Sequence, residues 1–348
     1  MFSILRPYIF SLDPEVAHDL AIKSLKANFL PESFFKVEDE EMLNIKLFNN
    51  TLPNPIGLAA GFDKSAEVYN SLFKFGFGFI EVGTVTPERQ LGNPKPRIFR
   101  LEKDKALINR LGFNNDGSEI ISKRISKNLS RGFLGVNIGP NKETKNKEND
   151  YFVCLSKLFK HANYITINIS SPNTEDLRNF HKQEEMKKLL AGINKIKKEK
   201  KIDQPIAIKI SPDIDDSEIS RIIDLIKSFN IQGIIISNTT DNNRKNLSDI
   251  NKNEAGGLSG QPLKDISTNL IKKCYKETKG KIKIIGVGGV DSGQSAFEKI
   301  IAGADAVQLY TGMVYKGPGI VKEIKKELIS ILKKENLKNV SEAVGINA

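Results

Sequence analysis

A polar cluster follows an apolar segment near the middle of the chain, where residues 164–178 read YITINISSPNTEDLR. It contains five polar residues in close succession, namely Asn168, Ser170, Ser171, Asn173 and Thr174. An asparagine side chain offers donors and an acceptor in a fixed arrangement, which suits a flat ligand rich in amide groups. With no histidine close in sequence, a serine here could accept a proton or could simply be a turn residue. The role of this cluster therefore depends on what lies beside it.

Other apolar segments also end in residues that commonly bind ligands. Their ends contain Lys64, Thr84, Asn137, Lys209 and the sequence SNTT at residues 237–240, and an excursion reading INRLGFNND adds Asn109 and Asn114. Any one of these could be a turn or capping residue, which is the commoner role of a single asparagine. Buried amides and lysines cost free energy unless a ligand or a neighbour satisfies them. Six such ends together therefore indicate a pocket for a planar ligand with many donors and acceptors.

Two turns rich in small residues near the C-terminus suggest an anion site. They lie in GVGGVDS at residues 286–292 and in AGADAVQLYTG at residues 302–312. Backbone N–H groups in such turns, together with a helix N-terminus, can receive a phosphate. A phosphate site beside a pocket for a planar ring fits flavin mononucleotide (FMN), and a lysine could face the electron-rich edge of the flavin.

From Pro55 onward, short apolar segments alternate with amphipathic stretches. The predicted strands are Pro55–Ala59, Gly78–Val82, Phe133–Asn137, Tyr164–Asn168, Ile206–Ile210, Gly233–Ser237, Ile282–Gly286 and Ala306–Leu309. This alternation favours a parallel sheet, and about eight such units fit an α/β fold of the (β/α)8 TIM-barrel type better than an open doubly wound sheet. In such a barrel the residues that follow each strand meet on one face. Residues 31–348 are therefore predicted to form an FMN-binding TIM-barrel catalytic domain.

The N-terminal segment, residues 1–30, has a different pattern. Asp13-Pro14 is a strong helix start, with an N-cap residue followed by proline at the first helical position. Leu12, Val16 and Leu20 follow one another at helical spacing. The segment is therefore predicted to form two short amphipathic helices in a small lobe with one apolar face. That lobe could cap the bottom of the barrel or contact a membrane, and the pattern alone does not choose between them.

The composition limits the possible partners. The 348 residues carry a net charge of +11, which would permit an anionic partner. Most of that charge lies in mixed runs such as Lys195–Lys201 and Lys322–Lys326, which are typical of solvated helix faces, and no basic motif interleaved with aromatics suggests nucleic-acid binding. Cys154 and Cys274 are far apart and indicate neither a disulfide framework nor a metal site, which suits a reducing cytoplasm. No stretch approaches the roughly 18 apolar residues that span a bilayer.

The set AAGFDK, NRLGFNN, NISSPNT, GGLSG, GVGGVDS and YTG, in that order, resembles dihydroorotate dehydrogenases, and the similarity runs from the DPEVAH segment at residues 13–18 to the final helix. This combination is far more specific than any single motif. Members of that family carry FMN and oxidise dihydroorotate to orotate in pyrimidine synthesis. The resemblance implies the same activity and cofactor for this chain.

The resemblance also implies roles for individual residues. Those that would hold the flavin are Ala60, Gly61, Lys64, Thr84, Asn137, Asn168, Lys209, Ser237, Gly260, Gly289, Tyr310 and Thr311. Those that would hold the substrate are Lys64, Asn109, Arg110, Leu111, Gly112, Phe113, Asn168, Asn173, Asn238 and Thr239. Ser171 would accept the C5 proton of dihydroorotate while the C6 hydride passes to the flavin, with Thr174 as a candidate proton relay.

The serine also indicates the class of dehydrogenase. In the family, soluble enzymes that pass electrons to fumarate or to an NAD-linked partner use cysteine as the base, whereas membrane-associated enzymes use serine and reduce a quinone. This chain has Ser171, and its N-terminal segment resembles the two helices that form a lipid-facing tunnel in the quinone enzymes. We therefore expect a monomeric, peripheral protein on the cytoplasmic side of the cell membrane, with ubiquinone or menaquinone as acceptor.

The tunnel would be lined by His18, Arg100 and Tyr310, again by resemblance. A surface helix position is the alternative for His18. The two other histidines, His161 and His181, are expected to be structural or exposed to solvent.

Three alternative functions agree less well with the sequence than a quinone-dependent dehydrogenase does. A soluble, cysteine-type member of the same family is disfavoured by Ser171 and by the N-terminal helices. An FMN barrel reductase that acts on RNA uridines would need a basic RNA-binding extension, which is not evident. A barrel that binds a sugar phosphate without redox chemistry would keep the phosphate turns but has no need for Lys64, Lys209 and the NRLGFNN segment together.

Overall fold

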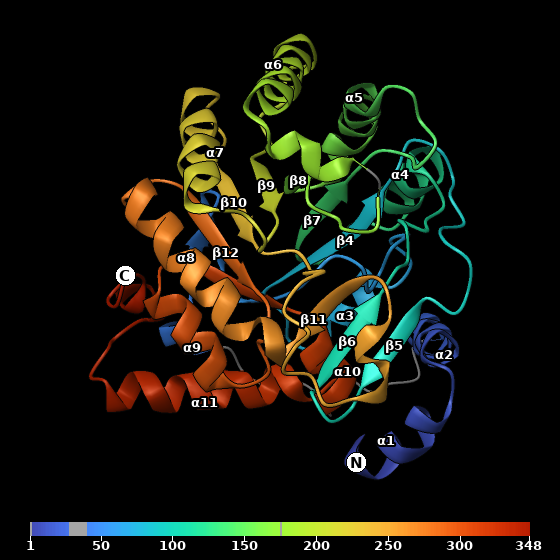
Figure 1. The fold of residues 1–348 in the computed structure, drawn as a ribbon. Helices are drawn as coiled ribbons and strands as arrows, with labels where there is room; N and C mark the ends of the chain where they lie inside the picture. Colours follow the sequence, from blue (N-terminus) through green and yellow to red (C-terminus); the bar gives the residue numbers. More distant parts are fainter. Residues whose placement is uncertain (1, 28–39, 175) are drawn as a thin grey trace.

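A closed barrel of eight parallel strands forms the centre of the molecule (Figure 1). The computed structural model describes residues 2–27, 40–174 and 176–348. Around the barrel the strands follow the order β10-β12-β13-β3-β4-β7-β8-β9. Their bounds are β3 Ile56–Leu58, β4 Phe79–Val85, β7 Phe133–Ile138, β8 Tyr164–Asn168, β9 Ile206–Ile210, β10 Gly233–Ile236, β12 Lys283–Val287 and β13 Ala306–Leu309. Each predicted strand overlaps one of these, so the predicted TIM-barrel fold is confirmed.

The barrel strands are short runs of β-branched and other apolar residues. Strand β9 reads IAIKI and β10 reads GIII, and every residue in both is buried. Strands covered on both faces show such continuous apolar runs instead of alternation. The parallel register pairs Asn168 of β8 with Lys209 of β9, which places these two polar residues side by side at the C-terminal ends of their strands.

Amphipathic helices surround the barrel and cover the outer face of the strands (Figure 1). Helix α7, Asp216–Ser228, shows why they form: Asp215 and Glu218 make a capping box at its start, and Ile219, Ile222 and Ile226 are buried at helical spacing. The other α-helices that follow the first barrel strand, β3, in the sequence are α3 Tyr69–Phe73, α4 Ser118–Lys127, α5 Lys147–Leu158, α6 Gln183–Lys200, α8 Lys264–Thr278, α9 Gly293–Ile301, α10 Thr311–Lys316 and α11 Ile320–Lys334.

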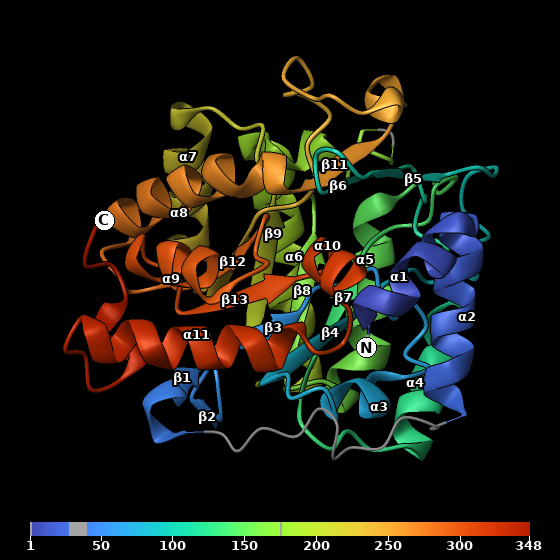
Figure 2. The ribbon, with the colours of Figure 1, turned by 90° about the horizontal axis from the view of Figure 1, so that it is seen from below.

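Two small antiparallel sheets lie at opposite ends of the barrel (Figure 2). One is a hairpin of β1 Ile45–Leu47 and β2 Asn50–Leu52, and its turn residue Phe48 packs on Tyr164, with ring centroids 5.3 Å apart. The other sheet, on the side of the strand C-termini, has the order β11-β6-β5, with β5 Ile98–Leu101, β6 Ala106–Asn109 and β11 Gly257–Gly260. The sequence analysis did not predict this sheet, which positions Asn109 at the end of β6.

The N-terminal lobe consists of α1, Phe2–Ser11, and α2, Pro14–Lys26. Asp13 caps α2 as predicted, because its Oδ1 accepts hydrogen bonds from the N–H groups of Glu15 (2.9 Å) and Val16 (3.1 Å). The lobe lies at the side of the barrel, next to β5 and α10, and the hairpin covers the bottom (Figure 2). The interpretation of the lobe as a cap over the barrel bottom is therefore wrong. The predicted boundary between residues 30 and 31 lies outside the described residues.

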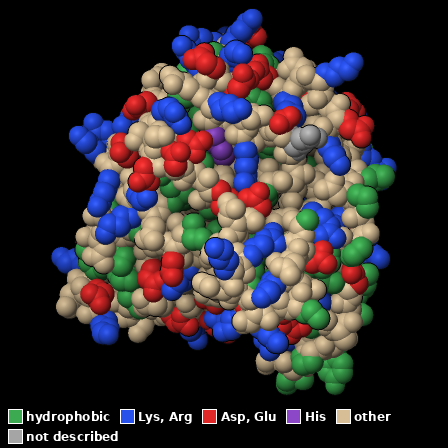
Figure 3. All heavy atoms as spheres, viewed as in Figure 1, with side chains coloured by type: hydrophobic (Ala, Val, Ile, Leu, Met, Phe, Trp, Pro, Cys, Tyr) green, Lys and Arg blue, Asp and Glu red, His purple; other side chains and the backbone are tan. Residues whose placement is uncertain are grey.

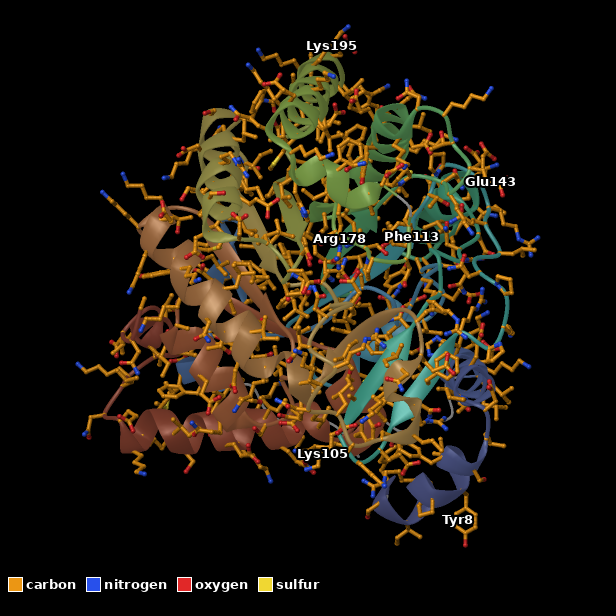
Figure 4. All side chains as sticks on the ribbon, in the orientation of Figure 1. Tyr8, Lys105, Phe113, Glu143, Arg178 and Lys195 are labelled. Atoms are coloured by element: carbon orange, nitrogen blue, oxygen red, sulfur yellow. The ribbon has the colours of Figure 1, made fainter. Side chains whose placement is uncertain are left out.

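The lobe exposes large apolar side chains. Ile4 and Tyr8 of α1 are 73% and 74% exposed, and Leu5, Leu12, Val16 and Leu20 are also exposed. Figure 3 shows hydrophobic side chains gathered at the edge of the molecule where α1 lies in Figure 1, and Tyr8 projects away from the ribbon in Figure 4. Among the described residues, no helix is both long and apolar enough to cross a membrane.

A buried ion pair fastens α2 to the barrel. The guanidinium of Arg97, just before β5, donates to Glu15 of α2 with an Nη2–Oε1 distance of 2.7 Å, and Lys95 lies 3.3 Å from the same carboxylate. Burial alone would raise the pKa of Glu15, but the hydrogen bonds and charges of Arg97 and Lys95 hold it below its usual value. The pair therefore stabilises the docked helix above the ordinary carboxyl pKa of 4.5, and this contribution is lost as the pH falls through the lowered value.

Replacing Glu15 with glutamine is expected to loosen α2 from the barrel. Removing one partner leaves Arg97 buried without its counter-charge, which costs about 3 kcal/mol, the lower end of the range for buried pairs. Amide hydrogen exchange in α2 should become about 100-fold faster. Asp19→Asn is the matched control, because it removes a carboxylate from the exposed side of the same helix. Equal exchange in the two variants would contradict the anchoring role.

Candidate active site

A cavity of about 390 Å³ opens at the C-terminal ends of the barrel strands. The residues predicted to hold a flavin that line it are Ala60, Gly61, Lys64, Thr84, Asn168, Lys209, Ser237, Gly260, Gly289, Tyr310 and Thr311. The lining residues predicted to hold substrate are Lys64, Asn109, Leu111, Gly112, Phe113, Asn168, Asn173, Asn238 and Thr239, and Ser171 lines the same cavity. The fold thus brings together residues that are up to 251 positions apart, counting from Ala60 to Thr311.

Two predicted residues lie outside the cavity wall. Asn137 is behind Thr84, whose hydroxyl donates to the Asn137 Oδ1 at 2.6 Å. Arg110 turns away, pairing with Glu254 at 2.7 Å and covering the ring of Phe99. Any contribution of the Arg110 side chain to ligand binding would therefore be indirect in this conformation.

The asparagine cluster beside Ser171 in the cavity consists of two hydrogen-bonded pairs, Asn168 with Asn238 and Asn173 with Asn109. Asn168 donates to the Thr84 hydroxyl at 3.0 Å and accepts from the Asn238 amide at 3.2 Å. Asn173 donates to the Oδ1 of Asn109 at 3.2 Å. These bonds fix the direction of each amide and leave the remaining donors and acceptors for a planar ligand.

Ser171 is buried, and its Oγ accepts a hydrogen bond from the Asn173 N–H at 3.3 Å. Within the described residues, no histidine or carboxylate hydrogen-bonds to this hydroxyl. Its surroundings therefore contain no partner of the Ser–His type, and a proton taken up by Ser171 would have to leave through another hydroxyl or through water. Thr174, also buried, lies three residues further along the same loop.

The segment that follows Ser171 is tied to two loops at the C-terminal ends of other barrel strands. Arg178, in the 3₁₀ helix Leu177–His181, donates to Asp213 at 3.0 Å and to Asp241 at 2.8 Å, across the loops that follow β9 and β10 (Figure 4). Further back, the Ser170 hydroxyl donates to the Lys209 carbonyl at 2.7 Å. The sequence analysis missed this ion-pair network, because its partners lie far apart along the chain.

His181, at the end of this 3₁₀ helix, is buried. Burial, followed by the charge of Arg178, lowers its pKa to about 4, so the imidazole is neutral at pH 7. Its position fits the expected structural role. His161 is partly exposed, and burial followed by the charge of Lys160 also lowers its pKa.

Two lysines reach the cavity without an anionic partner. In the part of the chain that the structure describes, neither Lys64 nor Lys209 forms an ion pair, although both line the cavity. Burial lowers the pKa of Lys64 to about 8 and also lowers the pKa of Lys209, which the charge of Glu81 partly opposes. Cations placed in this way favour a ligand that brings negative charge or develops it during a reaction.

The glycine turns lie against each other at one end of the cavity. A Cβ at Gly312 would come within 2.5 Å of the Val290 carbonyl oxygen, and one at Gly289 would come within 2.5 Å of the Lys264 Cβ. Gly289 has a φ of +71°, a conformation that other residues rarely adopt. The turns therefore require glycine, and their backbone N–H groups form the kind of cradle that receives a phosphate.

The same cavity extends to the N-terminal lobe, where Arg6, Phe10 and Tyr315 line it. Phe10 packs edge-to-face on Tyr315, with ring centroids 5.4 Å apart. The sequence analysis did not single out these residues. The signals available were the aromatic character of the first ten residues and the position of Tyr315 one helical turn after Thr311.

Of the predicted tunnel residues, Tyr310 lines the cavity. Arg100 stacks over the Phe10 ring at 4.6 Å and donates to the carbonyls of Phe10 and Leu12, so it holds the junction between α1 and α2. His18 lies behind Phe62, which separates it from Tyr310, and burial followed by the charge of Lys64 lowers its pKa to about 3. His18 and Lys64 also line a second, polar pocket of about 250 Å³.

These features define the class of the protein as a (β/α)8-barrel enzyme whose cavity fits an anionic, planar ligand and opens toward an apolar helical lobe. The chain belongs to the dihydroorotate dehydrogenase family, because the model of that family matches residues 42–332. The family resemblance found in the sequence is thereby confirmed. Membership implies a flavin cofactor, and the quinone in the names of the relatives below indicates a quinone acceptor.

Two bacterial relatives illustrate the similarity, and both are called dihydroorotate dehydrogenase (quinone). The protein of Bartonella tribocorum is 45% identical over 342 residues, which cover 97% of this chain and 94% of the relative. That of Bradyrhizobium diazoefficiens is 43% identical over 347 residues, covering 98% and 94%. Among solved structures, DHODH from Eimeria tenella in complex with ferulenol is 39% identical, with a TM-score of 0.91 and 96% of each chain covered. The ligand-free form gives the same TM-score.

Proposed function

We propose that this protein oxidises (S)-dihydroorotate to orotate in de novo pyrimidine (UMP) synthesis and passes the electrons through FMN to a membrane quinone. The observation that supports this most strongly is the single cavity that contains both Ser171 with its asparagine cluster and the glycine turns, and that continues to the apolar lobe. One reaction centre can thus reach a polar substrate at one side and an apolar acceptor at the other.

The cavity fits FMN. The Gln308 side chain is fully buried and lines the cavity, and its Oε1 has no hydrogen-bond partner among the described residues, so it can accept from an N–H group of the flavin ring. The turns at Gly260, Gly289 and Thr311 would hold the phosphate, and Lys209 would face the ring where negative charge increases on reduction. FMN, when bound, accepts the C6 hydride of dihydroorotate and delivers the electrons to the quinone.

The substrate would lie against the asparagine cluster. Asn109, Asn173 and Asn238 would hold its amide edges, and Lys64 would bind its carboxylate or the negative charge that develops on the carbonyl during proton removal. Ser171 accepts the C5 proton, and Thr174 is the candidate for passing it on. The serine is a weak base in isolation, so the reaction depends on the acidity that these surroundings give to the C5 proton.

The lobe would connect the barrel to the membrane. Its exposed Ile4, Tyr8 and Val16 can enter the headgroup region as an interfacial helix pair does. Residues 1–30 would thus act as a quinone- and membrane-contacting lobe of a monomeric peripheral protein on the cytoplasmic side of the cell membrane. Either ubiquinone or menaquinone would pass between Phe10, Tyr315 and Tyr310, with Arg100 and His18 close by.

A first experiment tests the redox function as such. The purified protein is expected to show the yellow absorption of one FMN per chain, and anaerobic dihydroorotate is expected to bleach it. A colourless protein that cannot be loaded with FMN would contradict every redox function and favour the sugar-phosphate alternative.

The affinity for orotate is expected to depend on pH through Lys64. Its pKa of about 8 means that the ammonium is lost at a lower pH than usual, so binding of the anion should be constant below pH 8 and weaken above it by about tenfold per pH unit. A titration followed by the flavin absorption measures this. Lys64→Arg should remove the break near pH 8, because its guanidinium stays charged. If orotate binding weakened near pH 8 in both the wild type and Lys64→Arg, the assignment of this pH dependence to Lys64 would be contradicted.

A further inference from the structure

Glu81 is a carboxylate enclosed in the barrel, on β4, with no exposed surface. Four side chains donate to it: Asn137 reaches Oε1 at 2.8 Å, and Tyr164, Thr166 and Gln308 reach Oε2 at 2.9, 3.1 and 3.1 Å. They come from β7, β8 and β13, on both sides of β4 in the barrel. Glu81 accepts from all four of these side chains, and no part of the mechanism above uses this carboxylate.

Two of these bonds orient amides at the flavin site, that of Gln308 in the cavity wall and that of Asn137 behind Thr84. Gln308 donates its amide NH₂ to Glu81, which turns the unpartnered Oε1 of the same amide to the other side, and Gln308 lines the cavity. Asn137 likewise uses its NH₂ on Glu81, so its Oδ1 is free to accept from the Thr84 hydroxyl. Without the carboxylate, either amide could rotate and exchange its donor and acceptor ends.

The Asn137 bond continues toward the substrate. Glu81 fixes Asn137, Asn137 fixes the hydroxyl of Thr84, and Thr84 accepts from Asn168 at 3.0 Å. A single buried carboxylate thus sets the direction of each hydrogen bond from the barrel interior to the asparagine cluster. In this chain of bonds the donor or acceptor role of each group is set by its neighbour, which favours one arrangement.

Glu81 also acts through its charge. In the described part of the chain no Lys or Arg pairs with it directly, and its negative charge partly offsets the effect of burial on the pKa of Lys209. Lys209 itself lines the cavity. A fixed negative charge on the barrel side of that lysine weakens the positive potential that a reduced, anionic flavin would experience.

We propose that Glu81 is a positioning residue for the flavin, which orients Gln308 toward the ring, fixes Asn137 behind Thr84, and lowers the reduction potential of the bound flavin by countering Lys209. This inference depends on the FMN binding proposed above. Glu81 lies outside the cavity, yet it would determine which groups of the flavin site donate and which accept. It would also contribute to the reduction potential of the flavin.

The test compares the midpoint potential and the FMN affinity of the holoenzyme with those of two Glu81 variants. Glu81→Gln removes the charge, so the equilibrium constant for flavin reduction should rise at least tenfold, which is about 30 mV for a two-electron couple. Glu81→Asp keeps the charge but is one methylene too short to reach all four donors. It should therefore weaken FMN binding about tenfold and leave the potential nearly unchanged.

Thr166→Val is the matched control, because it removes one hydrogen bond to Glu81 from a residue that does not line the cavity. It should change the potential and the FMN affinity less than the Glu81 variants do, because the charge and three of the four donors remain. A folded Glu81→Gln protein with an unchanged potential would overturn the redox role. If that variant does not fold, Glu81→Asp with wild-type affinity and potential would overturn the whole inference. A wild-type protein that binds no FMN would instead refute the proposed function.

Discussion

Replacing Ser171 with alanine is expected to slow the reduction of FMN by dihydroorotate by about 10²–10⁴-fold, the usual contribution of a general base. The flavin itself should remain bound, because the glycine turns and lysines that would hold it do not depend on this hydroxyl. The variant removes the hydroxyl that we propose takes the C5 proton, and it leaves Thr174, the candidate relay, in place. Anaerobic stopped-flow mixing with dihydroorotate, followed at the flavin absorption, measures the rate.

Ser211 offers a closely matched control for this variant. It follows β9 as Ser171 follows β8, it is buried, and its Oγ accepts from the N–H two residues ahead, that of Asp213, at 3.1 Å. Ser211 does not line the cavity. Ser211→Ala should therefore reduce its flavin at nearly the wild-type rate. A similar loss in both variants would point to a structural effect, and a normal rate in Ser171→Ala would refute the base assignment.

Replacing Ile4 and Tyr8 together with glutamate is expected to abolish most of the membrane binding and quinone turnover. Transferring each side chain from water to an apolar environment contributes about 1.5 kcal/mol or more, so losing both should weaken binding to lipid vesicles about 100-fold. Reduction of the flavin by dihydroorotate should continue, because neither residue lines the polar end of the cavity. Vesicle co-sedimentation and quinone-dependent turnover measure the two effects.

Leu129→Glu controls for the added charge. Leu129 is 75% exposed, much like Ile4 and Tyr8, and lies in the connection between α4 and β7, away from the lobe. This variant should keep both vesicle binding and quinone turnover. Equal losses of flavin reduction and quinone turnover in the lobe variant would contradict a specific role of the lobe, and so would unchanged vesicle binding.

The barrel could be predicted from the sequence because its strands are buried on both faces. Runs such as IAIKI and GIII have few other interpretations, and their spacing alone gives the number of β/α units. The β5-β6-β11 sheet could not be found in this way. Its strands read IFRL, ALIN and GLSG, and the pairing of Asn109 with Gly257 joins segments about 150 positions apart. Such a pairing leaves no local periodicity.

For the site, too, the residues that follow a local sequence pattern could be predicted, and the contacts between distant segments could not. Residues directly after the strands were predictable, since the topology of a barrel brings those positions together. The ion pairs of Arg178 and the four donors around Glu81 depend on side chains from separate strands and loops. In the sequence, Glu81 is only a polar residue inside FIEVGTV, and nothing in that segment indicates which partners surround it.

Steady-state oxidation of dihydroorotate with ubiquinone, menaquinone, fumarate and NAD, compared side by side in the presence of vesicles, tests the central claim most directly. Turnover is expected with at least one quinone and not with fumarate or NAD, because we assign the base role to Ser171 and the cavity opens to an apolar lobe. Turnover with fumarate or NAD, and none with either quinone, would contradict it.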